Sequence, residues 1–281
     1  MYFKQLIARI QRVNNQNNTL YNFSLSDKIT YILNAEYPGL KRNYPLISMK
    51  GNTDGYRIIE IKNHRYYWPE DSACEPLKWM YREVFCPPIM NFHSYETKDV
   101  KIVPGDTVID AGACEGFFSR YALERGASVI AIEPVPSLAQ ALKKTFHNEM
   151  IENRIQILPF ALGSKSGIAH LKYTSDSLFE ASISDEGDEI ETTTIDDISI
   201  EKTIDFIKMD VEGYEIEAVL GAKNTIQSQK PRLAIAVYHE YANASIISNI
   251  LKQCRPDYKI HYRGIYAWDN CVPRPFMVFA W

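Results

Sequence analysis

Apolar residues follow two different spacings along this chain, and the order of those spacings predicts an α/β protein. Short apolar runs bounded by glycine, proline or acidic residues are typical of strands buried on both faces of a parallel sheet. Apolar residues spaced three and four apart predict helices that pack on such a sheet. The last two strands should form a hairpin that gives the sheet an antiparallel edge. The expected strands of the main sheet are residues 107–109, 127–132, 155–160, 206–209, 232–238, 258–263 and 276–280.

The stretch from 107 to 133 is the most informative part of this pattern. It reads TVIDAGACEGFFSRYALERGASVIAIE, which predicts a strand, a glycine-containing turn, a helix and a second strand that ends on Glu133. Gly112 and Gly116 lie in the turn, where the absence of a side chain lets the backbone pass close to a ligand. An acidic residue at the tip of the second strand is placed to accept hydrogen bonds from ribose hydroxyls. The unit therefore indicates a cofactor that contains a nucleoside.

The composition of the turn favours one cofactor over another. A dinucleotide site has the glycine pattern G-x-G-x-x-G, but Cys114 stands two residues after Gly112 and Asp110 precedes the turn. A carboxylate repels phosphate and attracts the ammonium and sulfonium groups of S-adenosylmethionine (SAM). We therefore expect SAM, while a dinucleotide and a purely structural turn stay open as alternatives. The expected cofactor contacts are Glu96, Asp110, Gly112, Ala113, Cys114, Gly116, Phe117, Glu133, Pro134, Ala161, Leu162 and Asp210.

The second half of the chain holds the candidate catalytic residues. Asp210 follows the apolar run 206–209, at the edge of an open α/β sheet where ligands bind. Glu212 opens the next helix and is also explained by helix capping alone. His239 follows the run 232–238 at the same edge. We expect His239 to act as a general base that Asp210 orients, or these two residues and Glu212 to bind Mg²⁺, although no metal is required by the first arrangement.

Composition narrows the class of protein. The chain has 281 residues, 46% of them hydrophobic, a net charge of −4 and a pI of about 5.9. An acidic protein has no general electrostatic attraction to nucleic acid, so we expect no nucleic-acid partner. Stable membrane insertion is not expected, because no apolar run approaches the roughly 20 residues that a spanning helix needs. The absence of a signal-peptide pattern predicts a cytoplasmic protein, and five scattered cysteines predict reduced thiols.

The chain divides at the approach to the first main strand. We expect residues 1–92 to form an N-terminal α/β extension that contacts substrate or a second copy, and residues 93–281 to form the cofactor domain. The amphipathic helix 1–14 either packs on its own domain or makes a homodimer or membrane-surface contact. The polar segment 176–189 is expected to be a loop, either a mobile lid or an ordinary surface loop.

Five motifs together resemble the FkbM family of SAM-dependent methyltransferases. They are VIDAGACEGFFS, AIEPVP, TTTIDDI, IKMDVEGYE and KPRLAIAVYH, and the resemblance extends from about Tyr95 to Trp281. It implies a class I methyltransferase fold, Rossmann-like, with a seven-stranded mostly parallel sheet. It also implies transfer of a methyl group to a hydroxyl oxygen. Many members have Asn at the position of Cys114, which argues against a side-chain role for that cysteine.

The expected activity is SAM-dependent O-methylation of a small metabolite, a sugar or a glycan. Two alternatives come from other classes: an NAD-dependent oxidoreductase, and a non-catalytic module that only binds SAM. The acceptor cannot be derived from these motifs, because function belongs to the site and not to the fold.

Overall fold

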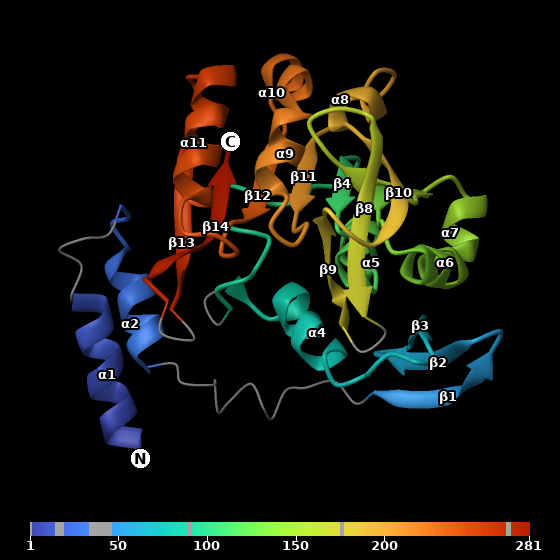
Figure 1. Ribbon diagram of the computed structural model, residues 1–281, viewed down its shortest axis with the longest axis horizontal. Coiled ribbons are helices and arrows are strands. Elements are labelled where there is room, and N and C mark those ends of the chain that lie inside the picture. Colours follow the sequence, from blue (N-terminus) through green and yellow to red (C-terminus); the bar gives the residue numbers. More distant parts are fainter. Residues whose placement is uncertain (1, 15–19, 34–46, 89–90, 175–176, 268–270) are drawn as a thin grey trace.

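A seven-stranded sheet forms the centre of the molecule (Figure 1). The computed structural model describes residues 2–14, 20–33, 47–88, 91–174, 177–267 and 271–281. The strands along the sheet are β13 (Ile260–Tyr266), β14 (Arg274–Ala280), β12 (Arg232–Ala236), β11 (Phe206–Met209), β4 (Thr107–Ala111), β5 (Ser128–Ile132) and β6 (Ile155–Leu158). The pairs from β12 to β6 are all parallel. The predicted α/β architecture with a mostly parallel sheet is confirmed.

The terminal hairpin differs from the expectation in one respect. β14 is antiparallel to β12 on one side and to β13 on the other, so the antiparallel strand lies one place inside the edge. The edge strand β13 therefore points in the same direction as the parallel strands. Burial explains this order, because Met277, Val278 and Phe279 have no exposed surface and need cover on both faces.

Helices cover both faces of the main sheet. Alternate residues of β4 point to opposite faces, and all but the half-buried Thr107 are buried: Ile109 packs with the cluster under one helical layer, and Val108 packs with the other. One layer consists of α9 (Glu215–Leu220), α10 (Lys223–Gln229) and α11 (Asn243–Cys254). The other layer contains α5 (Phe117–Glu124) and α6 (Pro136–Thr145), followed by α7 (His147–Ile151). This arrangement leaves the carboxyl ends of the parallel strands free to form a site.

The described part of the first 92 residues packs on the main domain at three places. The helices α1 (Tyr2–Asn14) and α2 (Leu25–Leu33) lie beside β13, where Asp27 Oδ1 accepts a hydrogen bond from the Gly264 N–H at 3.0 Å (Figure 1). An antiparallel sheet of β1 (Ser48–Thr53), β2 (Tyr56–Ile61) and β3 (His64–Pro69) lies against α6. The helix α4 (Leu77–Phe85) contacts α5. Division of the chain at residue 92 stays a prediction.

A smaller four-stranded sheet adjoins the carboxyl edge of the main sheet. Its order is β7 (Ala161–Leu162), β10 (Asp188–Thr193), β8 (Gly167–Thr174) and β9 (Ser177–Ser184), and α8 (Ile195–Ile198) follows it. The described part of the segment expected to be a loop is therefore mostly strand. Leu178 explains the difference, because it is buried in one cluster with Leu171 of β8. None of the described helices combines the length and the apolar character that a membrane crossing requires.

Candidate functional site

A cavity of about 570 Å³ opens at the carboxyl ends of the parallel strands. Its volume falls within the range of about 300–1,000 Å³ typical of small-molecule sites. The turn after β4 and the residues that follow β5, β6, β11 and β12 line one side. Residues of α4 and β9 also line the cavity, so two elements outside the main sheet complete the enclosure. The cavity lies at the edge predicted from the sequence.

The turn after β4 is packed so tightly that only glycine fits at its first position. Gly112 has a φ of +75°, and a Cβ atom there would lie 1.8 Å from the backbone oxygen of Asp210. The N–H groups of Gly112 and Ala113 both donate to Ile132 O at 3.0 Å, which ties the turn to the end of β5. Gly116 has a similar constraint, because its Cβ would lie 2.6 Å from Phe146. These contacts bring the strand ends together without side chains between them.

Glu133 presents a buried carboxylate at the cavity. It is 3% exposed, and it lines the cavity at the end of β5. Its Oε2 accepts the Cys114 N–H at 2.8 Å, and its Oε1 accepts the Val135 N–H at 2.9 Å. Burial raises the pKa of Glu133 to about 7, although both backbone hydrogen bonds oppose this. Each oxygen keeps a lone pair beyond its backbone bond, so the group suits a ligand that donates hydroxyl hydrogens.

Asp110 occupies a different environment from Glu133. It has no exposed surface, and its carboxylate bonds to Lys208 Nζ at 3.0 Å and to Ser119 Oγ at 2.7 Å. Lys208 also donates to Ala111 O at 3.2 Å and to Gly112 O at 2.6 Å, and it lines the cavity. Burial disfavours the ammonium, but Asp110 and other carboxylates outweigh it and raise the pKa of Lys208. Asp110 thus stabilises the turn indirectly, because it pairs with the Lys208 ammonium that donates to the turn's backbone oxygens.

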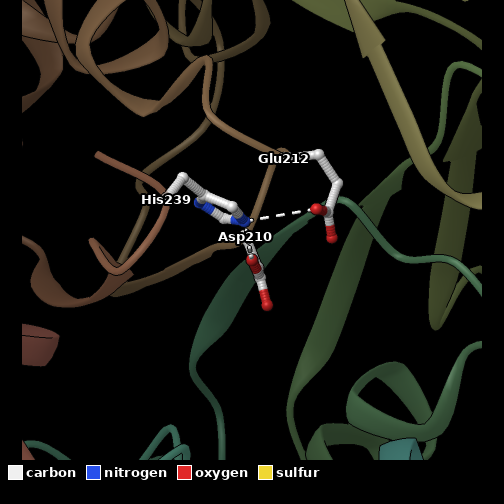
Figure 2. Close-up of side chains that lie close together, drawn as sticks. All are labelled: Asp210, Glu212 and His239. Carbon is white, nitrogen blue, oxygen red and sulfur yellow. Dashed lines mark hydrogen bonds and ion pairs between the residues drawn. The ribbon is translucent and has the colours of Figure 1, made fainter. Parts of the chain in front are cut away.

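Three candidate catalytic side chains meet beside the cavity (Figure 2). His239 Nε2 lies 3.2 Å from Glu212 Oε2 and 3.9 Å from Asp210 Oδ1. Its Nδ1 lies 3.1 Å from Glu215 Oε1, within ion-pair distance but without hydrogen-bond alignment. Burial disfavours the charged ring, yet the surrounding carboxylates prevail and raise the pKa of His239 to about 11. The ring is therefore protonated at neutral pH in this arrangement.

Local backbone geometry explains how Glu212 reaches this position. Glu212 has a φ of +52° and Gly213 a φ of +96°, so the chain turns sharply between β11 and α9. Glu215 is fully buried below this turn, and its Oε1 accepts the N–H groups of Val211 at 3.1 Å and Gly213 at 3.2 Å. The acidic residue that caps the turn also lies against His239. Glu215 therefore positions both the turn that carries Glu212 and the ring of His239.

A second histidine approaches Asp210 from the opposite side. His93 Nε2 lies 3.1 Å from Asp210 Oδ2, and its Nδ1 lies 3.1 Å from Glu83 Oε1 on α4. The Tyr95 hydroxyl donates to the same Asp210 oxygen at 2.7 Å. Burial disfavours both charges, but the pairing is stronger: it raises the pKa of His93 to about 10 and lowers that of Asp210. Asp210 Oδ1 is left buried without a hydrogen-bond partner among the described residues.

The three-residue cluster has the chemistry of a cation site. Asp210, Glu212 and His239 each offer one ligand atom, and these atoms lie within 4.8 Å of one another. Two carboxylates and one imidazole suit an oxygen-preferring divalent cation such as Mg²⁺ or Mn²⁺. A cation at this point would take the place of the proton that the carboxylates hold on His239.

The predicted site residues separate into two groups. Those in the cavity lining are Gly112, Ala113, Cys114, Glu133, Pro134, Ala161, Leu162, Asp210 and Glu212. Those outside the lining are Glu96, Asp110, Gly116, Phe117 and His239.

Residues outside the lining have structural contacts of their own. Glu96 accepts hydrogen bonds from the Ile102 N–H and the Tyr121 hydroxyl. Phe117 is buried against Tyr66, with ring centroids 5.0 Å apart. Direct contact of either residue with a cofactor stays a prediction.

Several lining residues were not expected from the sequence. Lys208 carried a signal, because a lysine inside the apolar run FIKM needs a buried partner. His93 lies three residues before Glu96 in the predicted lead-in to the main sheet, but nothing in the sequence favours it over its neighbours. The contributions of α4 and β9 depend on how distant parts of the chain pack.

Comparison with known protein families matches residues 110–258, more than half of the chain, to the Methyltransferase FkbM domain. The chain belongs to the FkbM methyltransferase family. The resemblance inferred from the five motifs is thereby confirmed. No curated protein gave a sequence match.

A solved structure of an FkbM methyltransferase shares the fold of this chain. A methyltransferase FkbM from Methylobacillus flagellatus aligns with a TM-score of 0.53 and 20% identity, over 99% of this chain and 58% of its own. This chain thus spans little more than half the length of that relative. A SAM-dependent O-methyltransferase from Thermotoga maritima aligns with a TM-score of 0.42 and 15% identity, over 79% and 76% of the two chains. The seven-stranded class I methyltransferase fold is confirmed.

Proposed function

We propose that this FkbM-family chain is a SAM-dependent O-methyltransferase that acts on a hydroxyl group of a small metabolite, a sugar or a glycan. One observation carries the proposal: a single cavity is lined both by Glu133 with the glycine turn and by Asp210 with Glu212. A donor held by the first group and a hydroxyl held by the second would share one enclosed space. Close placement of donor and acceptor supplies a large part of the catalysis of a displacement reaction.

The lining near β4 and β5 fits the nucleoside end of SAM. Glu133 is buried, forms no ion pair with the described residues and has lone pairs to spare, so the two ribose hydroxyls match it. Ala161 and Leu162 would lie beside the adenine. When bound, SAM supplies the electrophilic methyl group. The acidic lining favours its positive charge over the phosphates of a dinucleotide.

The acceptor hydroxyl has two routes to activation at the cluster of Asp210, Glu212 and His239. In the first, His239 takes the hydroxyl proton as a general base, with Asp210 orienting the ring. In the second, a divalent cation held by the three side chains lowers the pKa of the hydroxyl. The compact ligand set supports the second route, while the protonated state of His239 in the cation-free arrangement argues against the first.

Binding and turnover together test the proposal. Isothermal titration should show that SAM binds, and SAM should be converted to S-adenosylhomocysteine (SAH) in the presence of a panel of hydroxylated metabolites and glycans. A rise in melting temperature with NADH and none with SAM would instead support the oxidoreductase alternative. Binding of SAM without turnover on any acceptor would support the non-catalytic module.

The remaining expectations stay proposals. They are a cytoplasmic location, a homodimer contact through the N-terminal extension, and the absence of nucleic-acid and membrane partners. Each can be measured on the purified protein or in cells, and the proposed methyl transfer does not depend on any of them.

A further inference from the structure

Part of the cavity lining comes from α4, from Glu75 just before it, and from β9. On the α4 side the lining includes Glu75, Trp79 and Glu83, and on the β9 side it includes Phe179 and Glu180. Trp79 is 52% exposed, and Glu75 and Glu180 are also exposed. The proposed methyl donor lies beside Glu133 and the glycine turn. Glu75, Trp79 and Glu180 are exposed at the same cavity, where an acceptor that enters it can reach them.

Charge is distributed very unevenly over the lining. Seven acidic side chains line the cavity, and the only basic ones in the described lining are Lys208 and His93. Both are already engaged by protein groups. The Lys208 ammonium donates to two backbone oxygens and pairs with Asp110. The His93 ring pairs with Glu83 and Asp210 through its two nitrogens. The lining thus offers no free positive group to an anionic acceptor.

Two of the acids form no ion pair with a cation among the described residues. Glu75 makes no ion pair with the described part of the chain, and Glu180 accepts only a short hydrogen bond from the Ser177 hydroxyl. Arg82 lies 5.3 Å from the Trp79 ring centroid on α4, but it is not part of the lining. Glu75 lies just before α4 and Glu180 lies on β9, and both border the same cavity. They are placed to receive a positive charge from a ligand.

We propose that the acceptor is an amine-bearing hydroxyl compound, such as an amino sugar or an amino alcohol, and that Glu75 and Glu180 select it by charge. This inference rests on the proposed methyltransferase function and narrows its acceptor class. An amine is protonated at neutral pH and pairs with carboxylates, while a phosphate or carboxylate on the acceptor meets only like charge. The expected order of preference is cationic, then neutral, then anionic.

The test compares acceptors that differ in charge and little else. Labelled methyl transfer from SAM is measured with methyl glycosides of glucosamine, glucose and glucuronic acid, and with pools of amino alcohols, neutral polyols and sugar phosphates of similar size. Binding of the three glycosides to SAH-loaded protein is measured in parallel. Each exposed ion pair should change the preference by up to about fivefold. We expect the cationic members to be labelled and bound best and the anionic members least.

Variants assign the preference to the two acids. Glu75→Gln with Glu180→Gln should reduce the preference for cationic over neutral acceptors, and Glu75→Lys with Glu180→Lys should favour the anionic acceptors. Glu152→Gln is the matched control, because Glu152 is an exposed acid outside the lining that pairs with Arg154. It should leave the order unchanged.

The outcomes separate the two proposals. Equal or better labelling of neutral or anionic members, an order that the double variants do not change, or SAM binding with no member labelled or bound would overturn the acceptor assignment. The methyltransferase proposal would then still stand on its SAM binding. Failure of the native protein to bind SAM would remove the methyltransferase proposal and this inference with it.

Discussion

Glu133 provides the sharpest test of how the cavity holds a nucleoside. Replacing it with alanine removes both carboxylate oxygens from the lining at once. In the protein, these oxygens accept the N–H groups of Cys114 at 2.8 Å and Val135 at 2.9 Å. In the complex, they would also accept the two ribose hydroxyls. The Glu133→Ala change should therefore weaken cofactor binding and disturb the turn that follows β4.

The expected size follows from the number of bonds lost. A hydrogen bond to a charged group contributes about 1.5–3 kcal/mol, so two ribose bonds amount to about 3–6 kcal/mol. This corresponds to a Kd for SAM that is about two to four orders of magnitude weaker. Glu133→Gln keeps one acceptor oxygen and should give a smaller loss, although its amide NH₂ must then face one of the two backbone N–H groups.

Isothermal titration with SAM and SAH measures the effect, with circular dichroism to confirm folding. Asp106→Asn is a control for general loss of stability. Asp106 is buried just before β4, where it pairs with Arg232 at 2.6 Å, and it does not line the cavity. This variant should lower the melting temperature and leave the Kd unchanged. A folded Glu133→Ala protein that binds SAM within threefold of the native Kd would refute the assignment of the ribose to Glu133.

Four further predictions concern pH, packing and activation. Because the folded pKa of Glu133 is raised from 4.5 to about 7, ionisation of Glu133 should cost the cofactor-free protein about 3 kcal/mol of unfolding free energy as pH rises from 4.5 to above 7, and SAH should bind more tightly over the same range. In chemical denaturation and titration, Glu133→Gln should remove this part of both pH dependences and leave the part of the stability curve that comes from Glu115. Gly112→Ala should destabilise the fold by about 4 kcal/mol or more, because the new Cβ would overlap the Asp210 backbone oxygen, and a native-like thermal melt would contradict this. EDTA should lower turnover at least about tenfold and Mg²⁺ or Mn²⁺ should restore it, whereas turnover insensitive to EDTA would leave only the general-base route. His239→Ala should bind SAM normally and lose turnover, and retained turnover would place hydroxyl activation at another residue.

The main sheet could be predicted because its strands have a simple physical signature. A run such as FIKM in β11 is buried on both faces, and the observed strand, Phe206–Met209, has the predicted bounds. The carboxyl ends of parallel strands meet at one edge, so correct strand ends also located Glu133 and Asp210 beside one cavity. The apolar pattern that predicts the strands therefore also predicts the place of the site, because the ends of these strands form it.

The direction of Asp110 could not be predicted from the strand end alone. Asp110 pairs in register with Lys208 on the neighbouring strand, and both side chains turn to the same face of the sheet. A lysine buried in an apolar strand requires a carboxylate partner, and Asp110 supplies it. The sequence contains both residues, but their pairing depends on the register between β4 and β11, which a single sequence does not specify.

The part of the cavity proposed for the acceptor was also hard to predict, because it too depends on pairing between distant parts of the chain. β9 contains Ser177, Glu180 and other polar residues, so its composition indicates a loop, and its strand character comes from pairing with β8. The position of helix α4 over the cavity depends on its packing against α5, a contact between parts of the chain that are far apart in the sequence. Elements that arise from tertiary pairing carry little local signal.

The electrostatics of the cavity connect the proposed ligands with one another. Glu115 and Glu133 line it, and burial raises the pKa of each to about 7, so an empty cavity holds carboxylates at a cost in free energy. The methyl donor, the divalent cation and the amine-bearing acceptor are all positively charged, and each would relieve that cost. Methyl transfer converts the sulfonium to a neutral thioether, which weakens the attraction between the cavity and the spent donor. The same acidic lining that favours the donor over a dinucleotide would therefore favour release of the product, because the charge that it attracts is lost in the reaction.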